Sequence, residues 1–275
     1  MRKVGMVSND VFDLEEIMAS PKEMRQSRML DYLGRYDYIL KKNLPGWIPL
    51  SFEKKKILEI GSGATMGWAP IAAFLGCESY VCCEPMFNEA IRSDVRFQNL
   101  YLKKMHRDLL CPMFGPRLSF DQFLKRIDER VRVERQAYHS MNHSGSYDVM
   151  LSNSVLEHVF PLNDTLDRMR AESASGCRYL HDVDFGNHAP TEWPFENIYD
   201  APMESATKKH LGNINLFRVS DVHEMFLKAG FDSQFVPIVR IDPDSSVNMI
   251  HSDWTDRYDM ENLNVKTALF VSGTK

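Results

Sequence analysis

A short glycine-containing turn and a later glutamate carry the clearest chemical signal in this 275-residue chain. The apolar segment from Lys56 to Ile60 runs directly into Gly61-Ser62-Gly63, and Glu84 follows the next apolar segment. Glycines at the end of a parallel strand let the backbone approach a ligand without interference from Cβ atoms. An acidic side chain about twenty residues later can accept hydrogen bonds from both hydroxyls of a ribose. The spacing therefore predicts a nucleotide-like ligand lying across the carboxyl ends of parallel strands.

A second group of chemically capable residues lies in the run His181-Asp182-Val183-Asp184-Phe185-Gly186-Asn187-His188. If this run begins in a strand, alternation sends His181 and Asp184 to opposite faces. The end of a parallel strand emerges at the ligand edge of the sheet, where Asp184 and His188 are expected to meet as a base and its orienting partner. A hydroxyl nucleophile must lose its proton as its new bond forms, and histidine suits that task at neutral pH. We therefore predict His188, Asp184 and His181 as catalytic residues.

The same run allows two other interpretations. A cluster of histidine and aspartate can bind a divalent metal beneath the hydroxyls of an acceptor. Asp or Asn can also simply cap the helix that follows. A divalent metal is the less favoured alternative, and no metal ligands are predicted.

Apolar segments of strand length alternate with segments rich in helix formers, which is the pattern that builds parallel sheets. The expected strands are residues 56–60, 79–83, 130–135, 147–152, 177–183, 231–239 and 265–272. Helices are expected over residues 68–75 and 220–229, the second with Ser220 as its cap and Gly230 at its end.

The first fifty residues are expected to form a helical cap that precedes the main domain at 51–275. Ser20-Pro21-Lys22-Glu23 combines a capping serine, a proline at the first helical position and a glutamate that completes a capping box. Apolar residues then recur at helical spacing until Pro45 ends the pattern. Three insertions are expected at about 86–129 (with two helices), 185–219 and 241–264, and long irregular insertions are usually functional loops or lids.

Two sequence runs resemble the class I S-adenosylmethionine (SAM)-dependent methyltransferases. They are LEIGSG followed by CCEP, and Asp148 to Val159, which reads DVMLSNSVLEHV. A dinucleotide fold more often has a small apolar residue where this chain has Glu59, and a third glycine where it has Met66. The resemblance covers roughly residues 55–185, with a looser match over 211–272. It implies an α/β Rossmann-like fold, with a mostly parallel seven-stranded sheet, helices on both faces, an N-terminal helical cap, an inserted lid and an antiparallel last strand.

The resemblance also implies which residues hold the cofactor. Glu59, Gly61 and Gly63 would hold the methionine part, and Glu84 would meet the ribose. Gln136 and Ala137 would flank the adenine, and the run from Ser152 to Ser154 would border the sulfonium. In chain order the predicted cofactor residues are Glu59, Gly61, Ser62, Gly63, Glu84, Pro85, Gln136, Ala137, Ser152, Asn153, Ser154 and His158. A histidine at the place of His158 more often packs and hydrogen-bonds locally than takes part in chemistry.

Four residues are predicted on the acceptor side. Asn213, Asn215 and Arg218 precede the late helix and suit hydroxyls or an anionic group such as phosphate. The alternative is that the asparagines serve the backbone of their own loop and that Arg218 pairs on the surface. Tyr32, on the early helix, either closes over the ligand or packs in the core.

Composition and charge limit the function classes. The net charge of −5 argues against a general nucleic-acid binder, which needs a basic surface to neutralise phosphates. No apolar run approaches the length of a membrane span and the start lacks a signal-peptide core, so a cytoplasmic protein is expected. The five cysteines show no zinc-type spacing. A homodimer is compatible with these features.

The expected activity is methyl transfer from SAM, with S-adenosylhomocysteine as product, to a small-molecule or glycan acceptor. A hydroxyl of a sugar, glycan or phosphorylated metabolite is the preferred acceptor. An N- or C-methyltransferase acting on another metabolite and a non-catalytic SAM-binding module are the alternatives.

Overall fold

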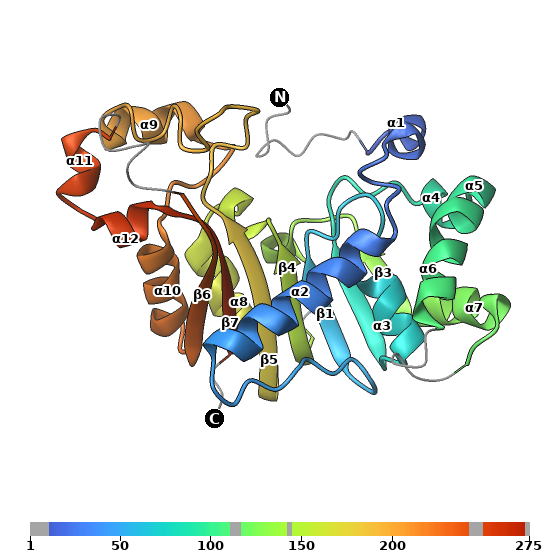
Figure 1. The fold of residues 1–275 in the computed structure, drawn as a ribbon. Helices are drawn as coiled ribbons and strands as arrows, with labels where there is room; N and C mark the ends of the chain where they lie inside the picture. Colours follow the sequence, from blue (N-terminus) through green and yellow to red (C-terminus); the bar gives the residue numbers. More distant parts are fainter. Residues whose placement is uncertain (1–10, 111–116, 142–144, 242–249, 273–275) are drawn as a thin grey trace. The chain divides into compact units, whose positions relative to one another are not determined.

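The computed structural model describes residues 11–110, 117–141, 145–241 and 250–272 (Figure 1). The described chain divides into two compact units. We name the first the glycine-loop unit, which comprises the described residues up to Ser152 together with 172–178. We name the second the histidine unit, which comprises residues 153–171 and the described residues from Tyr179 onward.

The strands form a seven-stranded sheet in the order β3-β2-β1-β4-β5-β7-β6, which confirms the predicted fold class. Pairings of β1 with β2, of β1 with β4 and of β2 with β3 are parallel. β7 pairs antiparallel with both β5 and β6, as expected for the last strand. The bounds are β1 Lys56–Ile60, β2 Ser79–Cys83, β3 Val131–Glu134, β4 Tyr147–Asn153, β5 Ser173–Asp184, β6 Ser233–Arg240 and β7 Val265–Ser272.

The glycine-loop unit is built on continuous apolar strands, as parallel sheets covered on both faces require. After its first residue β1 is wholly buried, and β2 follows the same pattern. Helix α3, Ala69–Leu75, has a proline in its first turn and ends at Gly76, whose φ of 87° is the left-handed conformation of a helix terminus. Helix α2, Ser27–Asn43, is tied to this region because the Trp68 indole N–H donates to the Met29 carbonyl at 3.0 Å.

The predicted start of the N-terminal helix at Ser20 is wrong. Helix α1, Leu14–Ala19, ends at Ser20, and α2 begins only at Ser27. The Ser20 hydroxyl does accept the Glu23 N–H at 3.2 Å, but this capping bond closes a turn rather than a helix. A capping bond satisfies only a local donor, whereas a helix is sustained by packing of its apolar face, and in α2 the buried side chains begin at Met29.

The late helix α10, Val219–Lys228, begins one residue earlier than predicted, and Ser220 is not its cap. Arg218 occupies the cap position, and its backbone N–H donates to the Asp221 carboxylate at 2.8 Å. The end is as expected, because Gly230 follows the helix with a left-handed φ of 85°.

The insertions contain more helix than the sequence indicated. Residues 86–129 were expected to hold two helices, but Asp94 interrupts the run by capping the N–H groups of Arg96 and Phe97. The described helical segments there are α4 Ala90–Ser93, α5 Val95–Phe97, a π-helical segment Gln98–Leu102, α6 Lys103–Leu109 and α7 Phe120–Arg130. The later insertions hold α9 Met203–His210, α11 Ser252–Thr255 and α12 Met260–Leu263. Parts of the predicted insertions, residues 111–116 and 242–249, lie outside the described residues.

The remaining described elements are short or lie beside the sheet. They are the 3₁₀ turns Tyr138–Ser140 and Leu156–His158, and helix α8, Leu162–Ala171. Cys77, Cys82 and Cys83 are free and buried, as small core residues. Within the described ranges no helix combines the length and the apolar character that a membrane span requires.

His181 lies in the aromatic core of the histidine unit. Its ring centroid is 5.6 Å from that of Tyr179 and 5.7 Å from that of Phe226, and the side chain is fully buried. Burial lowers the pKa of His181 to about 3. This position favours packing over acid–base chemistry, so the predicted catalytic role of His181 receives no support from its surroundings.

We expect His181→Leu to reduce the sensitivity of the fold to acid. Between the ordinary pKa of about 6.5 and the folded value, only the unfolded chain binds a proton, so stability falls as the pH falls through this window. At pH 5 this protonation of the unfolded chain lowers the free energy of unfolding by about 2 kcal/mol, at about 1.4 kcal/mol per pH unit below 6.5. Urea unfolding at pH 7 and pH 5 should show a loss of stability that is smaller in the variant by about this amount. Equal losses of stability in the wild type and in His181→Leu would contradict the burial of a neutral His181 ring.

Candidate functional site

The loop that follows β1 holds four residues in the left-handed backbone region. Gly61, Gly63, Met66 and Gly67 have φ values of 72°, 63°, 65° and 50°. The Gly61 N–H donates to the Cys83 carbonyl at 2.9 Å, which fixes the loop to the end of β2. A Cβ built on Gly63 would meet nothing within 4 Å, so space is open above the loop at this point. The loop thus offers the bare backbone and the room that a bound ligand needs.

Glu59 lies beneath this loop and supports it. Its buried carboxylate accepts the Trp68 N–H at 3.2 Å and the Tyr80 hydroxyl at 2.8 Å. A Cβ on Gly67 would lie 2.1 Å from a Glu59 carboxylate oxygen, so only glycine fits there. Burial raises the pKa of Glu59 to about 8, against the opposing effect of these two hydrogen bonds. This contact explains why the chain departs from the dinucleotide glycine pattern. Met66 occupies the position of the third glycine, and the glycine stands one residue later, at Gly67, where the loop passes over Glu59.

Glu84 joins the loop to the end of β2. One oxygen of its carboxylate accepts the Gly63 N–H at 2.9 Å, and the other accepts the Met86 N–H at 3.2 Å. Burial raises the pKa of Glu84, while both backbone bonds lower it. A carboxylate oxygen has further lone pairs, so each can still accept a hydroxyl of a ribose. The glycine loop and the acid predicted to work together are therefore in direct contact.

The other predicted cofactor residues of this unit follow neighbouring strands. Gln136 and Ala137 are half-buried in the turn after β3, Pro85 is exposed after β2, and Ser62 is buried in the loop. Ser152 is fully buried in β4, where it pairs with Ile60 of β1. These residues fit a nucleoside ligand in type and place, and their contacts with it stay a prediction.

In the histidine unit, the segment after β4 is fixed to β5 through Ser154. This residue has a left-handed φ of 53°, its N–H donates to the Asp182 carbonyl at 2.9 Å, and its hydroxyl donates to the Asp182 carboxylate at 3.0 Å. Asn153, just before it, is half-buried. The turn Leu156–His158 follows directly, so its position depends on this connection.

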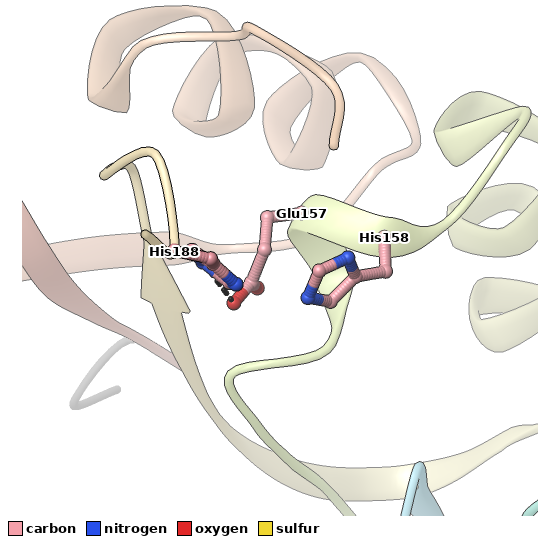
Figure 2. Close-up of side chains that lie close together, drawn as sticks. All are labelled: Glu157, His158 and His188. Atoms are coloured by element: carbon pink, nitrogen blue, oxygen red, sulfur yellow. Dashed lines mark ion pairs between the residues drawn. The ribbon is translucent and has the colours of Figure 1, made fainter. Parts of the chain in front are cut away.

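Glu157, His158 and His188 come together in this unit, and we call them the Glu–His–His cluster (Figure 2). One potential ligand atom of each lies within 4.8 Å of the others. His188 Nε2 is 3.6 Å from Glu157 Oε1, and the two imidazole ring centroids are 4.8 Å apart. Figure 2 shows Glu157 and His158 extending from the turn after β4 toward His188, which comes from the loop after β5.

Burial dominates the electrostatics of the Glu–His–His cluster. It raises the pKa of Glu157 well above the ordinary value, and the charges of Asp182 and Asp184 act in the same direction. It lowers the pKa of His158 and of His188. Both imidazoles are therefore neutral at pH 7, each with one nitrogen able to accept a proton or bind a cation.

Asp184 does not supply the carboxylate that contacts His188 Nε2. Its side chain pairs with Lys266 Nζ at 2.7 Å and accepts the Gly186 N–H at 2.8 Å. The acid in contact is Glu157, for which the sequence predicted no role. The available signal was the adjacency of Glu157 to His158 directly after a strand, but a buried carboxylate cannot be distinguished from an exposed one in the sequence. The catalytic role of Asp184 stays a prediction.

The predicted acceptor residues fall into different positions. The Asn213 carbonyl lies 2.6 Å from His158 Nδ1, and the Asn215 side-chain amide donates to the Leu156 carbonyl at 2.8 Å. Both asparagines therefore support the Glu–His–His cluster through its backbone and rings. Tyr32, in the glycine-loop unit, stacks on its neighbour Tyr36 with centroids 5.7 Å apart. Direct contact of these residues with an acceptor stays a prediction.

Arg218 is buried rather than paired on the surface, with 1% of its area exposed. Its guanidinium donates to the Phe185 carbonyl at 3.1 Å and to the Tyr199 hydroxyl at 2.8 Å. It also lies 5.3 to 5.8 Å from the ring centroids of Phe185, Tyr199 and Trp254. The residue therefore organises an aromatic core, and its surroundings leave little access for an anionic acceptor.

Comparison with known proteins identifies the class. A family model for a methyltransferase domain matches residues 12–234, which is most of the chain. The chain belongs to this methyltransferase family, and it is an enzyme of the SAM-dependent methyltransferase class. The resemblance found in the sequence is thus confirmed, with SAM as the methyl donor. No curated protein matches the chain.

Solved structures with a similar fold have low sequence identity to this chain. A SAM-dependent methyltransferase from Mesorhizobium loti is 13% identical, with a TM-score of 0.44 over 81% of this chain and 92% of that one. Phosphoethanolamine N-methyltransferase 2 from Haemonchus contortus, in complex with SAM, is 11% identical, with a TM-score of 0.47 over 96% of this chain and 60% of that one. At these TM-scores and identities the similarity supports no conclusion about the acceptor.

We expect Gly67→Ala to weaken SAM binding at least tenfold, because the new Cβ displaces the Glu59 carboxylate that supports the loop. Gly46→Ala is the matched control: Gly46 also has a positive φ, 83°, but its Cβ would meet nothing within 4 Å. Left-handed backbone strain costs both variants about 1–2 kcal/mol of stability. Isothermal titration with SAM should show the loss only in Gly67→Ala, and equal affinities would refute the role given to Glu59.

Proposed function

We propose that the chain transfers the methyl group of SAM to a hydroxyl oxygen of a small-molecule or glycan acceptor. The observation that carries this proposal is the Glu–His–His cluster, in which two neutral imidazoles lie beside a carboxylate in the turn and loop that follow β4 and β5. In open α/β sheets, ligands bind beyond the carboxyl ends of the strands. The position of the cluster after these two strands supports its assignment to the acceptor.

The chemistry explains why a hydroxyl suits such a cluster. The sulfonium of SAM supplies an already activated methyl group. The acceptor oxygen forms its bond to the methyl carbon while the carbon–sulfur bond breaks, and the electron pair of that bond stays on sulfur. The hydroxyl proton must leave at the same time, because its pKa lies far above 7. A neutral imidazole of His188 or His158 can take this proton. His188 is the preferred candidate because its side chain is 27% exposed and can therefore be reached by an acceptor.

The charges near the cluster favour an uncharged acceptor group. Arg218 is buried among aromatic rings, and Lys266, whose charge acts on His188, is neutralised by Asp184 at 2.7 Å. Recognition of a phosphate would require cations that are free to meet it. A hydroxyl of a sugar or glycan therefore fits these surroundings better than a phosphorylated metabolite, although a phosphate remote from the reacting oxygen is compatible with them.

The donor site of this proposal is formed by the glycine loop and Glu84. The backbone at Gly61 and Gly63 meets the methionine part, the Glu84 carboxylate accepts the ribose hydroxyls, and Gln136 and Ala137 flank the adenine. The open space at Gly63 and the contact between Gly63 and Glu84 support this assignment.

Glu84→Gln tests the donor site with little change in volume. An amide offers one acceptor oxygen in place of two and carries no charge, so SAM affinity should fall about tenfold, the equivalent of 1.4 kcal/mol. Glu78→Gln, at a side chain 58% exposed, is the control and should bind SAM like the wild type. Isothermal titration with SAM and with S-adenosylhomocysteine measures both, and an unchanged affinity in Glu84→Gln would remove the ribose contact from the proposal.

His188→Gln tests the acceptor chemistry. Turnover should fall about 10²- to 10⁴-fold, the usual contribution of a positioned acid–base group, while SAM affinity stays within twofold. A panel of sugars, glycan fragments, phosphorylated metabolites and amines, incubated with SAM carrying a ¹³C-methyl group, reveals the acceptor. Nuclear magnetic resonance then assigns the labelled methyl to oxygen, nitrogen or carbon.

His251→Gln is the matched control for this substitution, since His251 lies in the same unit outside the cluster. A methyl group found on nitrogen or carbon would overturn the hydroxyl assignment. Full turnover in His188→Gln would overturn the role of the cluster.

A further inference from the structure

The Glu157 carboxylate is an unusual feature of the histidine unit. Its residue is 1% exposed, and neither carboxylate oxygen makes a hydrogen bond of normal length within the described chain. The 3.6 Å separation from His188 Nε2 exceeds the length of a hydrogen bond. A buried acid without such partners is costly, and its presence calls for a ligand that satisfies it.

His158 is held in an orientation that leaves one nitrogen free to bind a cation. A carbonyl oxygen can only accept, so the contact of 2.6 Å between His158 Nδ1 and the Asn213 carbonyl requires the proton on Nδ1. In the neutral ring, Nε2 then carries the lone pair. Metal-binding histidines commonly use the same arrangement, with one nitrogen donating to a carbonyl and the other coordinating the ion. The Asn215 N–H donates to the Glu157 carbonyl at 2.6 Å. This bond fixes the backbone of Glu157, the second candidate ligand in the turn Leu156–His158.

The size of the cluster is close to that of a coordination sphere. Nitrogen and oxygen ligands bind first-row metals at about 2.1 Å, so two ligands of one ion lie at most about 4.2 Å apart. The three candidate atoms lie within 4.8 Å of one another, so a contraction of several tenths of an ångström brings them into range. Rotation of the partly exposed His188 ring can supply this movement.

We propose that Glu157, His158 and His188 bind a divalent transition-metal ion such as Mn²⁺ or Zn²⁺. Two imidazoles and one carboxylate suit such ions better than Mg²⁺ or Ca²⁺, which prefer oxygen ligands. Three protein ligands leave one position open in a tetrahedral ion and three in an octahedral one. Asp182 adds negative charge near Glu157, while the charges of Asp184 and Lys266 offset each other across their ion pair. The local charge therefore favours a cation.

The open positions give the ion a place in the reaction, and this part rests on the proposed function. In an octahedral ion such as Mn²⁺, an acceptor with two neighbouring hydroxyls, as in a sugar, would be able to occupy two of them. Coordination lowers the pKa of a hydroxyl, so its proton can pass to solvent without a histidine as base. The expected acceptor class is thus a compound with vicinal hydroxyls.

Metal binding is tested first without donor or acceptor. Protein treated with EDTA and then dialysed is titrated with MnCl₂, ZnCl₂ and MgCl₂, and thermal unfolding is recorded in parallel. One Mn²⁺ or Zn²⁺ per chain with a raised melting temperature is expected, and Mg²⁺ should bind at least tenfold more weakly. Electron paramagnetic resonance of bound Mn²⁺ reports the same site independently of enzyme activity.

The variants separate this site from adventitious binding. Glu157→Gln, nearly equal in volume, should fold and bind Mn²⁺ at least tenfold more weakly, as should His158→Gln and His188→Gln. His251→Gln should bind like the wild type. Absence of binding in the wild type, or equal binding in Glu157→Gln and His251→Gln, would overturn the metal site.

The two proposals can fail separately. Metal binding without methylation of any hydroxyl would overturn the proposed acceptor and leave the metal site. Hydroxyl methylation that persists at full rate in EDTA, by protein without bound metal, would overturn the ion's role and leave a histidine as the base.

Discussion

The glycine loop depends on one buried carboxylate beneath it. Glu59 holds the Trp68 N–H and the Tyr80 hydroxyl, and its oxygens occupy the space that a side chain at position 67 would need. At Gly67 the loop must therefore pass over Glu59 as bare backbone, in a left-handed conformation that few residues adopt. Glu84 fixes the same loop from β2 through Gly63. Two carboxylates from neighbouring strands thus help to determine the path of a loop whose residues from Ala64 to Trp68 are themselves buried.

Glu59 and Glu157 are both buried, but their surroundings differ in kind. Glu59 has a hydroxyl and a backbone donor, which offset much of the cost of removing it from water. Glu157 lies beside a neutral imidazole and near two further carboxylates, which make its charge harder to retain. The first arrangement is that of a structural support. The second resembles a site prepared for a cation or a proton, and for this reason we propose that Glu157 and its neighbours act on the acceptor side.

The strands could be predicted because strands buried on both faces are recorded in the sequence as largely apolar runs, as in the parallel strand Lys56–Ile60 and the antiparallel strand Val265–Ser272. The loop and Glu84 followed from the spacing of glycine and acid. Capping motifs were less informative about where helices begin. The Ser20 hydroxyl accepts the Glu23 N–H, but no helix follows this hydrogen bond. The meeting of Glu157 with His188 depends on two segments about thirty residues apart, and neither the burial of the acid nor the ion pair of Asp184 with Lys266 has a local signature.

The segment between His188 and Asn213 has fixed points at both ends. Asn213 and Asn215 are tied to the turn that carries Glu157, while Trp193, Phe195 and Tyr199 give the segment an aromatic core of its own. Because the reacting groups are anchored outside it, its exposed side chains can change without moving them. Under the proposed function, side chains of this segment that meet the acceptor could differ without displacing the Glu–His–His cluster. A segment that is anchored at its C-terminal end and carries its own aromatic core can therefore tolerate changes of surface without loss of the cluster's geometry.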